Sequence, residues 1–486
     1  MWSMKLTQKH NILDIVKEKS IKYIAFNSNA VVAGGMFFVT EYIEEYLQKA
    51  LQNGAAFIVS KDPISTIPSN IANIIVDDVR SALGEVAAFL YPEKPKHMVA
   101  VTGTSGKSSI VDYFRQICKT LGVKAASIGT MGVYCSDENI EKIIREKFPI
   151  DLTTPDVISM HKILNMLAKY GIDYVAFEAS SHGIDQQRIA SIKTSIAIFT
   201  NFSQDHLDYH GTMEEYKKAK IKLFSNHLSP DGTVIISDEL LADNDIIDAL
   251  TKLDITRENG KLVIVGKQGD YAITKAQSTL DGQEIEFINN NQLYKAGLDI
   301  VGSFQAANIV MTLAALNKFG VNIHDAIIEL NTIKTVCGRL ERVTKKGDPY
   351  HVFVDYAHKP NALESSLSEL RLLCTGQLVV VFGCGGDRDR TKRKIMGEIA
   401  ARIADVVIVT DDNPRTEDAS GIRKQIMEGA PNALEIVSRE EAIAYGIGLM
   451  GSGDILLVAG KGHENYQIIG NSKIHFDDIE EVKKYI

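Results

Sequence analysis

Short apolar runs rich in β-branched residues alternate with longer stretches of helical periodicity along most of the chain. This alternation is typical of α/β units, in which each strand is followed by a helix that covers a largely parallel sheet. The runs read HMVAVTG, YVAFEAS, TSIAIFTN, TVIIS, YHVFVDYAH, QLVVVFGCGGD, DVVIVTDDNPR and DILLVAGKGHE. The pattern therefore predicts an α/β fold.

Two breaks in this pattern divide the chain into three predicted domains. The polar segment YPEKPKH at 91–97 ends a first, small α/β region, and a third set of strands begins after a helical stretch at 304–318. The predicted domains are 1–97, 98–335 and 336–486. A chain of 486 residues is long enough for about three domains.

Nearly every apolar run ends in a cluster of residues that can bind phosphate or take part in a reaction. The clusters are TGTSGKSS, EASSHG, TNFSQDHLDYH, DYAH, GCGGDRDR, DDNPR and GKGHE. Gly, Asp and Asn are common turn residues, so one such cluster alone is as well explained by a turn. Ligands of open α/β sheets bind at the carboxyl ends of the strands. Seven clusters in this position predict a large composite site in a cleft between domains.

The loop at 103–108 carries a shortened phosphate-binding signature. The general P-loop reads G-x-x-x-x-G-K-[ST], but Val101 occupies the place of its first glycine. The order strand, loop, helix places backbone N–H groups and a helix N-terminus where they can hold phosphate oxygens. Lys107 can then reach a terminal phosphate, and the Ser108 hydroxyl can ligate Mg²⁺. A plain glycine turn before a helix has the same pattern, so the loop alone does not decide.

A lysine lies on the apolar stripe of a predicted helix at 213–224. The stripe has helical spacing and consists of Met213, Tyr216, Lys220, Leu223 and Phe224. Such a lysine can pack its stem and extend its ammonium to water, whereas full burial favours the neutral, nucleophilic amine. A neutral amine can take up CO₂ as a carbamate, which can hold Mg²⁺. His206 and Glu178, each just after a strand, can supply further ligands.

Composition and charge exclude several classes of protein. A net charge of −9 argues against a nucleic-acid binder. The N-terminal residues contain no apolar core of a signal peptide, and no apolar run is long enough to span a bilayer. The five cysteines include no C-x-x-C pair, so we interpret them as small core residues of a protein in a reducing cytosol. We therefore expect a cytoplasmic protein without nucleic-acid or membrane partners.

Ten motifs together resemble the Mur ligase family, and within it the MurE type. In chain order they are TGTSGKSS, DLTTP, EASSHGIDQQR, TNFSQDHLDYH, YKKAK, GRLE, VDYAH, GCGGDRD, DDNPR and GKGHE. The resemblance extends from about residue 98 to the end, and more weakly from residue 21. It implies a UDP-substrate-binding N-terminal domain, a P-loop ATPase-like central domain, and a Rossmann-like C-terminal domain that binds an amino acid.

The resemblance also implies a reaction. Enzymes of this type add meso-diaminopimelate to UDP-N-acetylmuramoyl-L-alanyl-D-glutamate through an acyl phosphate made with ATP, in bacterial peptidoglycan precursor synthesis. Phosphorylation gives the poorly electrophilic carboxylate a good leaving group. Such phosphoryl transfer requires charge neutralisation and positioning, which two Mg²⁺ ions and Lys107 would provide. The chain is expected to be a monomer in the bacterial cytoplasm.

By resemblance, the site residues fall into four groups. The catalytic group is Lys107, Glu178, His206 and Lys220, with one Mg²⁺ near Ser108 and Glu178 and another near His206 and Lys220 as N6-carboxylysine. The ATP contacts are Gly103, Thr104, Ser105, Gly106, Lys107, Ser108, Ser109, Asn308, Arg339, Asp355 and His358. The UDP-muramoyl-dipeptide contacts are Ser28, Thr153, Thr154, Ser180, Gln186 and Arg188. The diaminopimelate contacts are Arg388, Asp412, Asn413, Pro414, Arg415, Gly460 and Glu464.

The choice of diaminopimelate depends on Arg415 and Glu464. A guanidinium can grip the far carboxylate of diaminopimelate with two hydrogen bonds, and Glu464 can pair with the far ammonium. Lysine offers no far carboxylate. Read alone, Arg415 is a solvated residue after the turn D-N-P. The resemblance is weaker in the first domain, where Asn27 and Asn29 replace residues of a D-S-R triplet and a loop is missing.

Several other functions remain as alternatives. A lysine-adding Mur ligase or a folylpolyglutamate synthetase would share the ATP chemistry, although DDNPR and GKGHE together favour diaminopimelate. A simple P-loop NTPase or kinase would need neither Lys220 nor a third domain. A non-catalytic binding protein on a ligase scaffold would be expected to lose Lys107, His206 or Lys220, and all three are present.

Overall fold

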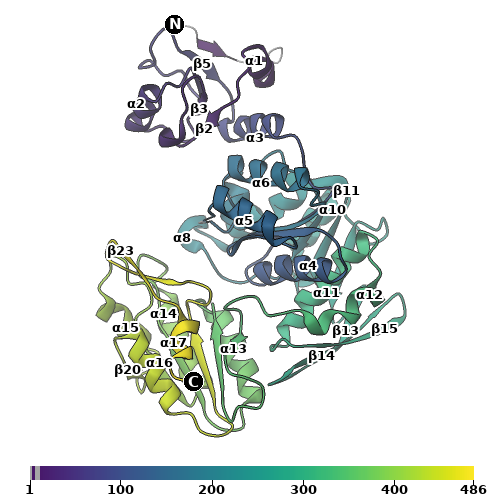
Figure 1. Cartoon of the computed structure of the whole chain (residues 1–486), viewed down its shortest axis with the longest axis vertical. Coiled ribbons are helices and arrows are strands. Elements are labelled where there is room, and N and C mark those ends of the chain that lie inside the picture. The colour runs from purple at the N-terminus through teal and green to yellow at the C-terminus, as the bar shows by residue number, and fades with distance from the viewer. Residues whose placement is uncertain (1–2, 6–10, 151) are drawn as a thin grey trace.

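Three α/β bodies follow one another along the chain in the computed structural model, with the N-terminal body at one end and the C-terminal body at the other (Figure 1). The structure describes residues 3–5, 11–150 and 152–486. Within these ranges the strands form sheets of five, ten, six and two strands. Asp151, the first residue of the motif DLTTP, lies outside the described residues. The predicted α/β fold with mostly parallel sheets is confirmed.

The N-terminal sheet is entirely parallel, in the order β1-β5-β4-β3-β2. Its elements are β1 (Ser3–Lys5), α1 (Ile12–Glu18), β2 (Ile24–Ala25), η1 (Ser28–Ala30), β3 (Met36–Phe38), α2 (Glu44–Gln52), β4 (Phe57–Ser60), β5 (Ala72–Ile75) and α3 (Val79–Leu90). Asp78 is the N-cap of helix α3, and its side chain accepts hydrogen bonds from two backbone N–H groups of the first turn. A Cβ on Gly84 of α3 would come within 2.5 Å of Ala190 Cβ, so this close approach to the central body requires glycine.

The central sheet has the order β15-β14-β13-β12-β11-β10-β6-β9-β7-β8 and is antiparallel only at its two edges. Its strands are β6 (His97–Thr102), β7 (Ala125–Gly129), β8 (Gly132–Cys135), β9 (Tyr174–Glu178), β10 (Thr194–Phe199), β11 (Leu228–Ser237), β12 (Leu262–Gly266), β13 (Tyr271–Thr279), β14 (Gly282–Asn289) and β15 (Gln292–Leu298). Its helices are α4 (Lys107–Thr120), α5 (Glu138–Lys147), α6 (Val157–Lys169), α7 (Ser181–Asp185), α8 (Leu207–His210), α9 (Met213–Lys222), η2 (Leu223–His227), η3 (Asp238–Ala242), α10 (Asn244–Lys252), α11 (Phe304–Lys318), α12 (Ile323–Ile328) and η4 (Leu330–Thr332).

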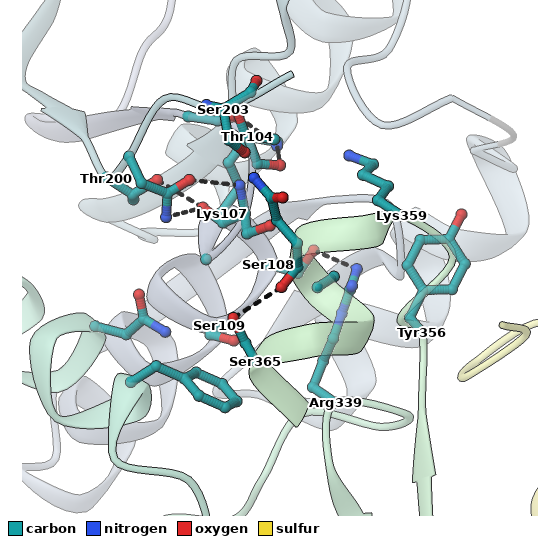
Figure 2. Close-up of a pocket in the computed structure, with 18 of the residues that line it drawn as sticks. Thr104, Lys107, Ser108, Ser109, Thr200, Ser203, Arg339, Tyr356, Lys359 and Ser365 are labelled. Carbon is teal, nitrogen blue, oxygen red and sulfur yellow. Dashed lines mark hydrogen bonds between the residues drawn. The ribbon is translucent and has the colours of Figure 1, made fainter. Parts of the chain in front are cut away.

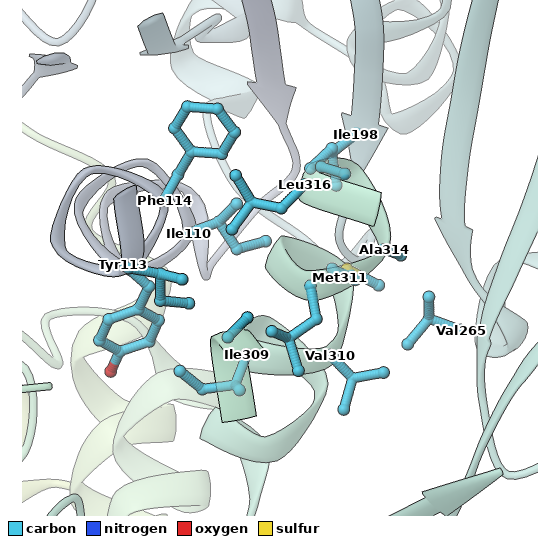
Figure 3. Packing of buried hydrophobic residues seen from close by; sticks show 14 of the residues in the cluster. Ile110, Tyr113, Phe114, Ile198, Val265, Ile309, Val310, Met311, Ala314 and Leu316 are labelled. Atoms are coloured by element: carbon cyan, nitrogen blue, oxygen red, sulfur yellow. The ribbon is translucent and has the colours of Figure 1, made fainter. Parts of the chain in front are cut away.

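Helices α4 and α11 pack together on one face of the central sheet. Phe114 of α4 and Leu316 of α11 lie in the same buried cluster as Ile198 of β10 and Val265 of β12 (Figure 3). Helix α11 is apolar on nearly all sides and carries a long run of buried residues, as expected of a helix enclosed within a core. This packing fixes the N-terminus of α4, where the phosphate loop ends, against the sheet.

The C-terminal sheet has the order β16-β17-β21-β18-β19-β20, with only β16 antiparallel. Its elements are β16 (Glu341–Arg342), β17 (His351–Asp355), α13 (Pro360–Leu373), β18 (Leu378–Phe382), α14 (Lys392–Ile403), β19 (Val406–Val409), α15 (Ala419–Met427), β20 (Leu434–Glu435), α16 (Arg439–Gly448), β21 (Ile455–Ala459) and α17 (Asp478–Lys483). A separate hairpin joins β22 (Tyr466–Ile469) to β23 (Ser472–His475). We propose 1–97, 98–335 and 336–486 as the domain limits.

The hairpin of β13 and β14 extends from the central sheet to the C-terminal body (Figure 1). Leu280 at its tip packs against the C-terminal core, and Arg342 donates a hydrogen bond to the Leu280 carbonyl oxygen. Val301 of the central body is buried in the same C-terminal core. Apolar side chains of the central body therefore contribute to the C-terminal core and hold the two bodies together.

Two sequence expectations concern exposure. The interpretation of the cysteines as core residues holds for three of them, but Cys337 is exposed because it lies in the connection between the central and C-terminal sheets. All five thiols are free. Among the described residues, no helix combines the length and the apolar character needed to cross a bilayer.

A buried ion pair holds the last helix of the chain. The Arg439 guanidinium donates to both carboxylate oxygens of Asp478 at 2.7 Å and to the Ala459 carbonyl oxygen at 3.0 Å, and both charged side chains are 0% exposed. Replacing Arg439 by methionine would leave a buried carboxylate unpaired. We expect Arg439→Met to lower the free energy of unfolding by about 3–5 kcal/mol, measured by urea titration.

The matched control removes both charges. Arg439→Met combined with Asp478→Leu is expected to recover most of that loss, because no unpaired charge remains. A single variant as stable as the parent protein would show that Asp478 readily finds water or another partner.

Candidate active site

A cavity of about 650 Å³ lies between the central and C-terminal bodies. Its volume is in the range of small-molecule sites. It is lined by residues of four predicted clusters, namely TGTSGKSS, EASSHG, TNFSQDHLDYH and DYAH, and by the start of α11. Figure 2 shows side chains from both bodies facing one another across it. All the residues that the sequence predicted as ATP contacts line this cavity.

The phosphate loop has glycine at two positions where φ is positive. Gly106 has φ +85° and forms the N-cap of α4, and Gly103 has φ +144°. A Cβ on Gly103 would lie 1.9 Å from the Thr200 hydroxyl oxygen, so the loop can approach β10 closely only with glycine. Asn201 supports the loop by accepting a hydrogen bond from the Ser105 N–H at 2.9 Å.

Lys107 folds back over this loop. Its ammonium donates to the carbonyl oxygens of Gly103 at 2.7 Å and Thr104 at 3.1 Å. Burial, assisted by the neighbouring Lys359 charge, lowers the pKa of Lys107 to about 8. A phosphate group would favour the charged form and compete with the carbonyl oxygens for its donors.

Ser108 and Glu178 form the oxygen-rich part of the site. The Ser108 hydroxyl donates to Glu178 Oε1 at 3.0 Å, and the Thr130 N–H donates to the same oxygen at 2.8 Å. A Cβ on Gly129 would lie 2.2 Å from Glu178 Oε1, so only glycine leaves room for this carboxylate. Arg339 of the C-terminal body donates to the Ser108 hydroxyl at 3.2 Å (Figure 2).

Lys220 is buried rather than extended to water. Its side chain leaves the residue 1% exposed, and its Nζ lies 2.9 Å from the Gly103 carbonyl oxygen and 4.5 Å from the centre of the Tyr216 ring. Burial, with the charges of Lys107 and Lys359, holds its pKa well below the usual value. The second of the two sequence interpretations, a neutral amine, is therefore the one that this environment favours.

His206 faces the same cavity from the start of α8. Its backbone is left-handed, with φ +52°, and its Nε2 lies 2.9 Å from Asp205 Oδ2. Burial lowers the pKa of its imidazole. A neutral imidazole is the form that can ligate a metal.

The donor set fits Mg²⁺ that is shared with a phosphate. Among the described residues, no three His, Cys, Asp or Glu side chains gather into a metal-binding group. Mg²⁺ is usually held by one or two carboxylates together with substrate phosphates and water, so a complete protein cage is not required. Ser108 and Glu178 offer such oxygens 3.0 Å apart. His206 and Lys220 would match this chemistry only if Lys220 carried a carbamate.

The other predicted ATP contacts belong mostly to α11 and the end of β17. Asn308 donates to Gln305 Oε1 at 2.8 Å. Asp355 accepts a hydrogen bond from the Ser366 hydroxyl at 2.6 Å, and burial raises the pKa of its carboxyl. His358 Nδ1 lies 2.8 Å from the Tyr356 carbonyl oxygen, and burial lowers its pKa strongly.

Most of the residues predicted to contact UDP-muramoyl-dipeptide form a connected network. The Thr154 hydroxyl lies 3.0 Å from the Ser180 hydroxyl, and Arg188 donates to the Thr154 carbonyl oxygen at 3.0 Å and to Gln186 Oε1. Thr153 accepts a hydrogen bond from Thr130 at 3.1 Å. The remaining member, Ser28, is buried in the N-terminal body, apart from this network.

The predicted diaminopimelate contacts gather in the C-terminal body. Asn413 donates to Glu464 at 2.9 Å and accepts from Lys461 at 3.2 Å. Burial and the nearby Asp412 raise the pKa of Glu464. Arg415 donates to the Gly386 carbonyl oxygen at 2.9 Å. The other members of the set, found at or near these same strand ends, are Arg388, which is exposed, and Pro414 and Gly460, which are buried.

Four of the seven predicted clusters line this cavity, and the other three are not among its lining residues. GCGGDRDR, DDNPR and GKGHE follow β18, β19 and β21, at the same edge of the C-terminal sheet as DYAH, which lies at the end of β17. Tyr356 connects the cavity with the cluster GKGHE, because it lines the cavity and its ring centre lies 4.7 Å from that of His463.

Sequence reasoning missed three residues with prominent positions. Asp205 and Lys359 form an ion pair between the two bodies, and Lys461, which is fully buried, donates a hydrogen bond to Asn413. Each belongs to or directly follows one of the predicted clusters. A charged residue at the carboxyl end of a buried strand was the signal that could have identified them.

Comparison with known proteins gives the family. The sequence profile of the Mur ligase middle domain matches residues 101–316, and that of the Mur ligase glutamate ligase domain matches residues 338–462. The chain belongs to the Mur ligase family. The predicted resemblance is confirmed.

Curated members of the Mur ligase family match over nearly the whole chain. A protein of Rickettsia bellii (strain RML369-C), named UDP-N-acetylmuramoyl-L-alanyl-D-glutamate--2,6-diaminopimelate ligase, is 46% identical and covers 98% of this chain and 96% of its own. A protein of the same name from Chelativorans sp. (strain BNC1) is 40% identical and covers 99% of each chain.

Solved structures of Mur ligases share the fold. The structure of a UDP-N-acetylmuramoyl-L-alanyl-D-glutamate--2,6-diaminopimelate ligase has a TM-score of 0.67 and 30% identity, covering 96% of this chain and 94% of its own. The MurF ligase of Thermotoga maritima, in complex with ADP, has a TM-score of 0.62 at 19% identity and covers 96% and 97%. At that identity the likeness to the MurF ligase concerns the fold alone.

Proposed function

We propose that the chain is an ATP-dependent amide ligase that adds meso-diaminopimelate to UDP-N-acetylmuramoyl-L-alanyl-D-glutamate, as the names of its relatives describe for them. The observation that carries the proposal is the cavity in which the phosphate loop of one body meets Arg339 of the other, with Arg339 donating to Ser108 at 3.2 Å. The proposed setting is bacterial peptidoglycan precursor synthesis in the cytoplasm.

The reaction has two steps. A carboxylate oxygen of the UDP-muramoyl-dipeptide attacks the γ-phosphorus of ATP, the bond to the bridging oxygen breaks, and ADP leaves with the electron pair. The neutral amine nitrogen of diaminopimelate then attacks the acyl carbon, phosphate leaves with the electron pair of the broken C–O bond, and the nitrogen releases one proton to solvent. Both steps move negative charge across a cavity that Lys107 and Arg339 line.

The proposed roles of the remaining residues follow from their positions. Bound Mg²⁺ would neutralise phosphate charge, one ion held by Ser108 and Glu178 and a second by His206 and the carbamate of Lys220. Gly103, Thr104, Ser105, Gly106, Ser109, Asn308, Asp355 and His358 would contact ATP. Thr153, Thr154, Ser180, Gln186 and Arg188, together with Ser28 of the N-terminal domain, would hold the UDP-muramoyl-dipeptide. We propose that the enzyme acts as a monomer.

A phosphate-release assay tests the proposal. Purified protein would be mixed with ATP, Mg²⁺, UDP-N-acetylmuramoyl-L-alanyl-D-glutamate and a panel of amino acids. We expect phosphate release that depends on both substrates and is fastest with meso-diaminopimelate. Faster release with L-lysine would identify a lysine-adding enzyme. Release without an amino-acid requirement would favour a simple NTPase.

Arg415 provides a test of the amino-acid substrate. Its backbone is left-handed, with φ +53°, and is held by hydrogen bonds from its N–H to the Ile468 carbonyl oxygen at 3.1 Å and from the Gly470 N–H to its own carbonyl oxygen at 2.8 Å. Loss of a buried, bidentate charged pair costs about 2–5 kcal/mol. We expect Arg415→Ala to raise the KM for diaminopimelate by roughly 30-fold or more and to change the KM for ATP little.

Two controls define this result. Arg415→Lys keeps the charge but not the fork of donors, so it should recover only part of the affinity. Arg402→Ala, at an exposed position on α14, should leave the KM unchanged. An Arg415→Ala enzyme with the parent KM would show that Arg415 is a surface turn residue.

A further inference from the structure

Lys359 reaches across the cavity from the C-terminal domain to the central domain. It forms the N-cap of α13, four residues after Asp355 ends β17. Its ammonium pairs with the Asp205 carboxylate of the central domain, and the two side chains are only 15% and 13% exposed. A lysine that is held this far from solvent requires a strong anionic partner.

Several groups around Lys359 can interact with an anion. Lys107, Arg339 and the amine of Lys220 line the same cavity as Lys359, together with the carboxyl groups of Glu178, Glu239 and Asp355. The N-terminus of α13, a helix of 14 residues, also faces the cavity through Asn361 and Ala362. A helix N-terminus beside the cationic side chains of Lys107, Arg339 and Lys359 can hold an anion with several charges.

Lys359 and Arg339 share one geometric property. Both belong to the C-terminal domain, and both contact the central domain beside the predicted phosphate and metal residues, Arg339 at Ser108 and Lys359 at the neighbour of His206. Figure 2 shows the two side chains on the side of Tyr356, facing the loop that carries Lys107. A lysine here acts as a mobile point charge, because its ammonium ends a flexible four-carbon stem.

We propose that Lys359 is a catalytic residue supplied by the C-terminal domain, whose ammonium contacts the phosphoryl group as it passes from ATP to the substrate carboxylate. This inference rests on the proposed ligase function. The Asp205 carboxylate holds the ammonium in place, and a phosphoryl oxygen with greater negative charge competes with it. Because Lys359 belongs to the other domain, its charge reaches the phosphate only when the two domains are together.

The simpler alternative is that the Lys359–Asp205 pair only joins the domains. The two explanations differ in the step that Lys359 affects. A domain tie would alter substrate KM or the later attack by the amine. A phosphoryl contact alters the formation of the acyl phosphate, which can be measured in a single turnover with ATP and UDP-muramoyl-dipeptide, without diaminopimelate, by trapping the intermediate as a hydroxamate with hydroxylamine.

The test compares the parent enzyme with Lys359→Met and Lys359→Arg. We expect Lys359→Met to slow hydroxamate formation about 100-fold, while the KM for diaminopimelate changes less than about threefold. Lys359→Arg, which keeps a cation on a stem of similar length, should recover to within about tenfold of the parent rate. Lys394→Met, at an exposed position on α14, is the matched control.

Each outcome gives a decision. The inference is overturned if Lys359→Met forms the hydroxamate within threefold of the parent rate, or if its loss is confined to KM or to amide formation. If Lys359→Met does not fold, as judged by its melting temperature, Lys359→Gln replaces it with the same criteria. A parent enzyme that forms neither hydroxamate nor amide refutes the proposed ligase function itself, which separates that failure from this one.

Discussion

Lys107→Ala is expected to slow ligation by on the order of 10³-fold or more, because a cation that neutralises the transferring phosphoryl group supplies several kcal/mol to the transition state. Lys107 occupies the first turn of α4, and its ammonium is held 2.7 Å from the Gly103 carbonyl oxygen. Its direction is therefore set by the loop. The effect on ATP binding should be much smaller, since Arg339 and the backbone N–H groups remain.

The measurement separates the two quantities. Turnover would be followed by phosphate release at saturating substrates, and ATP binding by calorimetry. Lys119→Ala, at an exposed position on the same helix, serves as the control and should leave both unchanged. A loss of only tenfold in Lys107→Ala would indicate that the loop is a scaffold and that another group neutralises the phosphate.

Lys220→Ala is expected to abolish nearly all ligation, because the proposed carbamate would disappear with the amine. Burial and neighbouring cations keep the pKa of Lys220 well below its usual value, which increases the fraction of neutral amine that can react with CO₂. Carbamylation would also turn a cation crowded by Lys107 and Lys359 into an anion. The negative carbamate would then attract the ammonium groups of both Lys107 and Lys359.

Chemical rescue distinguishes this role from a structural one. Short-chain carboxylates should partly restore Lys220→Ala by occupying the space that the side chain leaves, and they should not help Lys107→Ala. The exposed Lys218, on the same helix, gives the control variant Lys218→Ala. A fully active Lys220→Ala enzyme would contradict the proposed carbamate. So would a parent enzyme whose mass in bicarbonate shows no added CO₂ and whose crystal structure shows a free amine.

The spacing of apolar residues predicted a helix or strand correctly where the same residues also become buried in the folded protein. The helical stretch at 304–318 is α11 (Phe304–Lys318), since its apolar residues suit both a helix and an enclosed position. The apolar stripe at 213–224 left open whether Lys220 extends its ammonium to water or is fully buried, and the structure shows it buried. The helix itself changes character at Leu223, where a π-helical turn begins. The spacing of apolar residues does not distinguish an α-helical turn from a π-helical turn.

Long-range pairings are the part that the sequence did not reveal. Asp205 and Lys359 come from different domains, and no local pattern links them. The left-handed backbone of Arg415 is imposed by the β22 segment rather than by the preceding proline alone. Which of the clusters are neighbours likewise depends on strand order, which the motifs do not contain. The site roles assigned by resemblance stay predictions until variants are measured.

The contacts of Leu280 and Val301 with the C-terminal core have a consequence for biosynthesis. Both residues leave the ribosome before the strands and helices that cover them, which lie between residues 340 and 459. A nascent central domain would display this apolar surface for the time needed to make the rest of the chain. Exposed apolar surface of this kind promotes aggregation and binding to chaperones. Truncation after about residue 335 should therefore yield a less soluble protein than the full chain, even though the central sheet would be complete.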